Sequence, residues 1–237
     1  MCGRYTQTAS LEKLQERFGF RPPGFELKPR HNIAPSQDAP VIVLDRDGRR
    51  LELFHWGLIP SWAQDPSMGR RLINARAETL MEKPSFRRSF DERRCLVAAD
   101  GFYEWAPRPG GAGKTPMRIT LQSRAPFAMA GLWDAWKDPA GGEIRSFAIV
   151  TTRAEGLMRR IHDRMPVILD AQAERRWLNP KSEPDELREL LIPWAGEALD
   201  AYEVTRLVNS PGNDTAACVK AARERPSPRS SDEDAAA

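Results

Sequence analysis

The sequence predicts an α+β fold built around a mostly antiparallel, barrel-like β-sheet with flanking helices. Two observations predict it: many short apolar runs of strand length, and hairpin-type turns between them. The chain has 237 residues, of which 41% are hydrophobic, and is therefore long enough to bury the core of one such domain.

We expect this domain to span residues 2–220, because no internal repeat divides the chain. Residues 221–237 contain only Ala, Ser, Pro and charged side chains, so they lack the large apolar groups that a folded segment buries. This C-terminal tail is expected to be disordered.

Capping signals indicate the helices. Ser10 is a good N-cap, and Gly19 a good C-terminal stop, for a helix with Leu14 and Phe18 on one face. Asp170 is a second N-cap candidate, and proline is favoured in the first turn of a helix. The expected helices cover residues 11–18, 171–178 and 184–191, with another short helix that opens at Pro84.

Turn signals and apolar runs indicate the strands. The runs 41–44 and 51–56 flank a four-residue turn that ends in Asp47 and Gly48, which predicts a hairpin. Residues 22–35 open with two prolines and a glycine and are expected to form a loop. Further strands are expected at residues 4–6, 95–99, 102–105, 117–121, 127–132 and 147–151.

Several classes of protein are disfavoured. No run of roughly 18 or more apolar residues exists, so no transmembrane helix is expected. The amino terminus has no apolar stretch of the secretory type, and we expect a cytoplasmic protein. The three cysteines and three histidines are widely spaced, which argues against a disulfide framework and a structural zinc site. We therefore expect no metal and no cofactor.

Arginine dominates the basic residues, with 29 of the 36, although the net charge is only +3. Arginine forks match phosphate geometry better than lysine does. A GC-rich genome also favours Arg, Ala and Pro codons, and we attribute the overall bias to that cause. Only arginines inside motifs count as evidence for nucleic-acid binding.

Cys2 carries the most distinctive chemistry. Methionine is commonly removed before a small residue, and its removal would leave an α-amine and a thiol on Cys2. Their ordinary pKa values are about 7.7–8.0 and about 8.5, so some neutral amine exists near pH 7. Such an aminothiol condenses with an aldehyde to an imine and closes to a thiazolidine. The alternative is an incidental small residue near the terminus.

Three further motifs carry polar side chains suited to chemistry. Asn74 can orient a hydroxyl or carbonyl, and Arg76 two residues later can bind a phosphate. Glu104 lies among aromatic residues, where desolvation raises the pKa of a carboxyl group. His162, two residues before Arg164, is a natural proton shuttle. The respective alternatives are a polar loop, an exposed glutamate on an edge strand and a surface histidine in a turn.

Strand alternation refines the prediction for Glu104. On the expected strand, Phe102 and Glu104 share one face, and Tyr103 and Trp105 share the other.

Aromatic and proline residues supply rigid apolar surface that can stack on bases or wedge them apart. We assign Trp56 to the core, whereas Trp62 and Pro35 are open between core and nucleic-acid contact.

Together these segments resemble the SOS-response-associated peptidase (SRAP) family of abasic-site-processing proteins. The resemblance runs from residue 2 to about residue 219. The residues that carry it are 1–5 (MCGRY), 32–35 (NIAP), 56–60 (WGLIP), 74–76 (NAR), 101–105 (GFYEW), 162–166 (HDRMP) and 204–209 (VTRLVN).

The resemblance implies a role for each matched residue. The nucleophile is Cys2, and the active-site partners are Asn74, Glu104 and His162. The DNA contacts are the phosphate-binding Arg4, Arg76 and Arg164, the wedge Pro35 and the stacking candidate Trp62. Some relatives have a second tryptophan after this last position, where this chain has Ala63, which puts the stacking role in doubt.

The resemblance also implies a reaction and a partner. Members of the family form a thiazolidine crosslink with the ring-opened sugar of an abasic site in single-stranded DNA, and the word peptidase reflects removal of the residues before the cysteine. We expect a monomer that associates with the nucleoid when it binds damaged DNA, and that shields the lesion during the damage response.

Two other functions compete. Glutamine amidotransferases with an N-terminal nucleophile also begin Met-Cys-Gly, but they usually carry an Asn-Gly segment for the oxyanion, and this chain has no Asn-Gly dipeptide. Glutaminase activity would support that reading. A non-catalytic module that binds single-stranded nucleic acid would instead show reversible, salt-sensitive binding without a covalent product.

Overall fold

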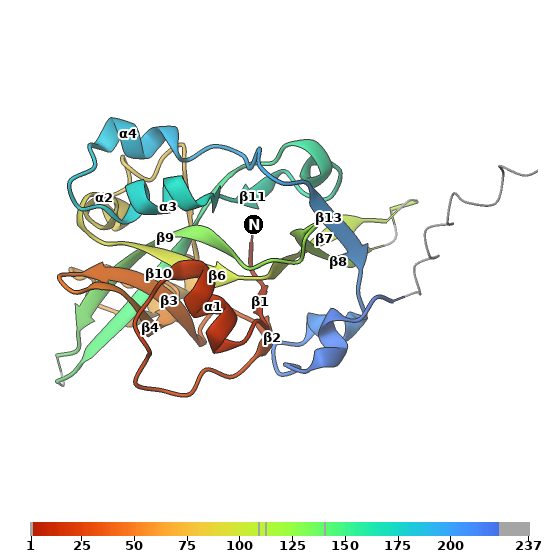
Figure 1. Ribbon diagram of the computed structural model, residues 1–237, viewed down its shortest axis with the longest axis horizontal. Coiled ribbons are helices and arrows are strands. Elements are labelled where there is room, and N and C mark those ends of the chain that lie inside the picture. Colours follow the sequence, from red (N-terminus) through yellow and green to blue (C-terminus); the bar gives the residue numbers. More distant parts are fainter. Residues whose placement is uncertain (1, 109, 112, 140, 223–237) are drawn as a thin grey trace, which may run out of the picture.

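A ring of five β-strands closes on itself and forms the main sheet of the structure. Its strands lie in the left half of the view in Figure 1. The computed structural model describes residues 2–108, 110–111, 113–139 and 141–222. Within that part of the chain the ring consists of β3 (Asp38–Asp45), β4 (Gly48–Trp56), β6 (Arg94–Ala99), β9 (Phe127–Lys137) and β10 (Glu143–Arg153). Neighbouring strands of the ring pair in antiparallel fashion, except that β10 pairs parallel with β4 and closes the ring. The mostly antiparallel, barrel-like α+β fold is therefore confirmed.

Three short strands extend this sheet at the C-terminal end of β10. They are β5 (Asn74–Arg76), β11 (Arg164–Pro166) and β12 (Ile168–Leu169). The first pairs parallel with β10 and sets Arg76 opposite Thr151, and the second pairs antiparallel and sets Arg164 opposite Arg153. The motif at residues 74–76 and the motif at residues 162–166 are far apart in the chain, yet both lie beside the C-terminal end of β10.

A second sheet lies beside the ring and carries the amino-terminal strand. Its order is β13 (Leu199–Glu203), β8 (Lys114–Leu121), β7 (Gly101–Pro107), β1 (Tyr5–Gln7) and β2 (Arg30–Ile33). The strand expected at residues 4–6 forms one residue later, and Tyr5 pairs with Phe102.

The prediction of a loop over residues 22–35 is wrong near its C-terminal end, because Arg30–Ile33 forms the strand β2. The carboxylate of Asp214 accepts the backbone N–H groups of His31 and Asn32, and it pairs with Arg30. These contacts come from a residue about 180 positions away, so no local signal in the sequence announces the strand.

The expected helices are present as α1 (Leu11–Phe18), α2 (Pro84–Glu92), α3 (Ala171–Leu178) and α4 (Pro184–Glu189). Ser10 caps the first, and Gly19 ends it in the left-handed region at φ 63°. The last helix stops two residues before the expected end. Short 3₁₀ segments add η1 (Pro66–Arg71), η2 (Gly156–Arg160), η3 (Arg206–Asn209) and η4 (Ala216–Val219).

Alternation along the ring strands divides the core in two. On β3, Val41 and Val43 face the cluster that contains Cys2, whereas Ile42 faces the cluster under the helices. On β9 the residues that face the helices include Ala128 and Ala130, whose small size lets α2 and α3 pack close to the sheet (Figure 1). Each large apolar side chain buried in this way contributes roughly 1.5–3 kcal/mol.

Trp56 lies in the core, as expected from its sequence. Its ring meets Tyr5 edge-on at 5.2 Å and stacks on Phe147 at 6.1 Å, and its indole N–H donates to the carbonyl of Ile73. Trp62, by contrast, is 56% exposed.

The described chain ends close to the second sheet, where Ala221 forms an isolated bridge with Val204. The remainder of the predicted tail, residues 223–237, lies outside the described residues. Within the described ranges, no helix combines the length and apolar character that crossing a bilayer requires.

Candidate active site

Cys2 is fully buried just before β1, in the core cluster that also contains Tyr5 and Trp56. Its carbonyl oxygen accepts a hydrogen bond from the side-chain amide of Asn74 at 3.0 Å. Burial raises the pKa of the Cys2 thiol, and the negative charge of Glu104 raises it further. The thiol is therefore protonated in the resting protein.

Asn74 reaches Cys2 from β5, which the parallel pairing with β10 holds in place. Its side-chain nitrogen Nδ2 donates the hydrogen bond to the Cys2 carbonyl. Its oxygen Oδ1 is buried and makes no hydrogen bond to any described residue. A buried acceptor without a protein partner is costly, so this oxygen is suited to receive a group from a bound molecule.

Glu104 lies on β7 and is buried, with 3% of the residue exposed. The predicted alternation is confirmed: Phe102 belongs to the main core, whereas Tyr103 and Trp105 pack with Val208 on the other face. Because β7 lies between β1 and β8, the alternative of an exposed glutamate on an edge strand is wrong. Burial raises the pKa of Glu104 to about 7, so both protonation states are populated near neutral pH.

His162 follows η2, and its Nε2 lies 3.9 Å from Oε2 of Glu104. The backbone N–H of Arg164 donates to its Nδ1 at 3.0 Å. Burial lowers the pKa of His162, and its side chain is 22% exposed. Cys2, Asn74, Glu104 and His162 thus meet at one place although they come from four separate segments.

The three motif arginines differ in what their side chains contact. Arg4 turns toward the C-terminal segment and donates to Asn32 and to the carbonyls of Val208 and Asn209. Arg164 makes a two-pronged pair with Glu78 at 2.6 and 2.9 Å and also donates to the carbonyl of Thr151.

Arg76 is exposed and lines a groove of about 1090 Å³ together with His162. Five arginines border this groove among the described residues, against two acidic side chains. They are Arg76, Arg153, Arg159, Arg160 and Arg164, opposed by Glu155 and Asp163. The groove is therefore a basic channel that leads to the His162 side of the site.

Sequence reasoning missed Arg153, Arg159 and Arg160. The signal was available, because all three precede His162 by at most nine positions. Arginine is so abundant throughout the chain that these three do not stand out. Pro35 is partly buried and Trp62 is exposed, and neither lines the groove.

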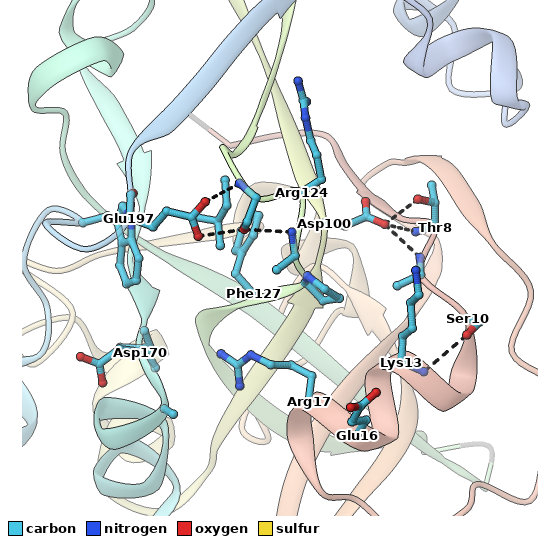
Figure 2. A pocket seen from close by; sticks show the side chains of 18 residues that line it. Thr8, Ser10, Lys13, Glu16, Arg17, Asp100, Arg124, Phe127, Asp170 and Glu197 are labelled. Carbon is cyan, nitrogen blue, oxygen red and sulfur yellow. Dashed lines mark hydrogen bonds between the residues drawn. The ribbon is translucent and has the colours of Figure 1, made fainter.

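A somewhat larger pocket, of about 1200 Å³, lies between α1, the turn after β8 and the start of α3 (Figure 2). Two of its carboxylates are committed to hydrogen bonds within the pocket. Asp100 accepts from Thr8, and Glu197 accepts from Ser123 (Figure 2). None of the predicted site residues lines it, so size alone does not identify the active site, and the chemistry favours the groove at His162.

Comparison with known proteins identifies the family of this chain. The family model described as SOS response associated peptidase (SRAP) matches residues 1–211. The chain belongs to the SRAP family.

Curated relatives of this SRAP protein carry a common name. The abasic site processing protein YoqW of Bacillus subtilis (strain 168) is 47% identical over 219 residues, which cover 91% of this chain and 97% of the relative. The abasic site processing protein HMCES of Xenopus tropicalis is 31% identical over 265 residues, covering 93% of this chain and 78% of the relative.

Solved structures share the SRAP fold. A crystal structure of a protein from Bacteroides thetaiotaomicron is similar with a TM-score of 0.82 at 31% identity, covering 94% of this chain and 100% of that one. A second, from Bordetella bronchiseptica, has a TM-score of 0.75 at 27% identity, covering 86% of this chain and 100% of that one.

Among the described residues, no group of three or more His, Cys, Asp or Glu side chains is arranged to hold a metal ion.

Proposed function

We propose that this protein processes abasic sites in single-stranded DNA by forming a thiazolidine crosslink through Cys2 after Met1 has been removed. The observation that carries the proposal is the convergence of Asn74, Glu104 and His162 on Cys2. The curated relatives named abasic site processing protein support the substrate class.

The chemistry requires two bond-forming steps. The free amine of Cys2 adds to the C1′ aldehyde of the opened sugar, and loss of water leaves an imine. The Cys2 sulfur then adds to the imine carbon while the thiol proton passes to the imine nitrogen, which closes the five-membered ring. No oxidant or metal is needed for either step.

Glu104 suits the proton transfers of both steps. A carboxyl group with a pKa of about 7 can accept a proton from the attacking amine and return one to the departing hydroxyl. The pKa of the Cys2 thiol is raised, so the thiol is protonated before ring closure. A nearby base must therefore take its proton and pass it toward the imine nitrogen. Each positioned acid or base of this kind contributes roughly 10²–10⁴-fold in rate.

The arginine-bordered groove suits the DNA backbone. Phosphate contacts hold a strand in register without reading its sequence, so we propose that any sequence around the lesion is accepted. We propose that the protein acts as a monomer, because every group that the reaction uses comes from this one chain.

The deciding experiment is incubation with single-stranded DNA that contains one abasic site, followed by a denaturing gel. The wild-type protein should give an adduct that survives heat without reduction. Its DNA-linked peptide should lack Met1 and show the loss of one water. A protein with a tag before Cys2 has an amide in place of the amine and should give no adduct.

Substitution of the sulfur separates the two steps. Cys2→Ser keeps the amine but replaces the thiol with a poorer ring-closing nucleophile. This variant should stop at an imine that borohydride traps and heat destroys. Full-rate crosslinking by a protein that still carries Met1 would refute the mechanism, because the thiol would then act alone.

A further inference from the structure

One nitrogen of His162 faces two different groups. The backbone N–H of Arg164 donates to Nδ1 at 3.0 Å, and Oδ1 of Asp163 lies 2.8 Å from the same atom. An N–H donor requires a lone pair on Nδ1, whereas a carboxylate requires a proton there. The two neighbours therefore stabilise opposite protonation states of Nδ1.

The other nitrogen, Nε2, faces the reaction site, 3.9 Å from Glu104. While the amide of Arg164 is bonded to Nδ1, the neutral ring carries its single proton on Nε2. Giving up that proton would leave an imidazolate, which is far too basic to form near neutral pH. A ring that acts as an acid through Nε2 must first take a second proton on Nδ1.

We propose that Asp163 is a positioning residue that holds the Nδ1 proton of His162, so that Nε2 can protonate the ring oxygen of the abasic sugar. This inference rests on the function proposed above. The C1′–O4′ bond breaks, O4′ takes the proton from Nε2, and the C1′ hydroxyl gives its proton to Glu104. The products are an aldehyde and a neutral His162 whose remaining proton lies on Nδ1, against Asp163.

The surroundings of Asp163 fit this role. Its side chain is 85% exposed, so water can deliver the proton that Nδ1 takes up. The neighbouring Arg164 does not neutralise it, because that guanidinium is matched by Glu78 and also donates to Thr151.

Other charged groups act on the ring from the packed elements around it. Glu104 faces it from β7, Lys114 acts from β8, and the arginines of the groove border it. Burial lowers the pKa of His162 most, Asp163 opposes that change, and Lys114 adds to the lowering. Removal of the Asp163 charge therefore lowers the pKa of His162, so that the imidazolium forms only at lower pH.

Nitrogen-15 NMR of the histidine rings tests the inference without DNA. The chain has only three histidines, so His31 and His55 serve as internal references. We expect a wild-type neutral form with the proton on Nε2, and a protonation midpoint that Asp163→Asn lowers by roughly 0.5–1 pH unit. Glu155→Gln removes the same charge from the same groove and should leave the midpoint unchanged.

Crosslinking rates provide the second readout. At pH 7.5, Asp163→Asn should react roughly threefold to tenfold more slowly than wild type, and this ratio of rates should shrink as the pH is lowered, because Glu104 is affected equally in both proteins. Asp163→Glu should regain most of the wild-type rate. Asp185→Asn changes a residue whose side chain is 94% exposed on α4, and it should match wild type throughout.

The outcomes separate this inference from the proposed function. An unchanged His162 midpoint in Asp163→Asn overturns the inference, even if the rate falls. Equal wild-type and Asp163→Asn rates across the pH range also overturn it. Failure of the wild-type protein to form any adduct would instead refute the proposed function, while the NMR comparison would still report on the Asp163–His162 pair.

Discussion

Two buried carboxylates at opposite ends of one short stretch, Asp100 and Glu104, have very different surroundings. Asp100 is 6% exposed, and Glu104 is 3% exposed. The first is surrounded by donors, which are the side chain of Thr6, the backbone and side chain of Thr8, the backbone of Ala9, and Arg118. The second has the ring of His162 at 3.9 Å, and burial raises its pKa to about 7.

The comparison shows that burial alone does not make a carboxylate reactive. A carboxylate that accepts several N–H and O–H groups has its charge stabilised and ties segments together. A carboxylate for which the cost of burial outweighs its favourable contacts, as at Glu104, holds a proton near neutral pH and can pass it on. Asp100 therefore joins β1 to the end of β6, and Glu104 is suited to proton transfer.

The largest effect is expected at the structural carboxylate. Asp100→Ala leaves Arg118 as a buried charge without its partner and should lower the free energy of unfolding by about 3–5 kcal/mol, measured by urea denaturation. Glu197→Ala is the matched control, because Glu197 also accepts from a backbone N–H but is exposed, and it should cost less than about 1 kcal/mol. Equal costs at the two positions would contradict the structural role of Asp100.

The pH dependence of stability is the next largest effect. Because the pKa of Glu104 is raised from 4.5 to about 7 in the folded state, its contribution is fully present below about pH 4.5. That contribution is lost as the pH rises through about 7, and its full size is on the order of 3 kcal/mol. Glu104→Gln should flatten the corresponding decline in unfolding free energy between pH 5 and 8. A decline as steep as that of the wild type would contradict the raised pKa.

Glu104→Gln should also slow crosslinking by roughly 10- to 1000-fold, because the amide keeps the shape but accepts no proton. Single-turnover rates on abasic single-stranded DNA measure this effect. Asp100→Asn, assayed under conditions where it remains folded, should keep a rate close to that of wild type. The comparison fails if both variants slow crosslinking equally.

The smallest effect concerns a single phosphate contact. Arg76 is exposed in the groove, so Arg76→Ala should weaken binding about equally for all DNA sequences and reduce the salt dependence by about one unit of slope. Arg46→Ala, on the exposed turn between β3 and β4, removes the same charge and should leave both quantities unchanged. Titration of undamaged single-stranded DNA at several salt concentrations distinguishes the two variants.

Much of the fold follows from local patterns. The caps Ser10, Gly19 and Asp170 define helix ends, and the turn before Gly48 defines a hairpin, because these signals act within a few residues. The strand alternation that separates Phe102 and Glu104 from Tyr103 is equally local. The motifs that contain the site residues, and their order in the chain, are also properties of the sequence alone.

Tertiary structure alone decided what those residues contact. The parallel pair between β10 and β4 closes the barrel, and Asn74 reaches Cys2 across 72 positions of sequence. Arg4 and Arg164 are of the same residue type, yet one is held by the C-terminal segment and the other by Glu78. Hydrogen bonds and desolvation depend on which distant groups come within a few ångströms, and no local pattern encodes that distance.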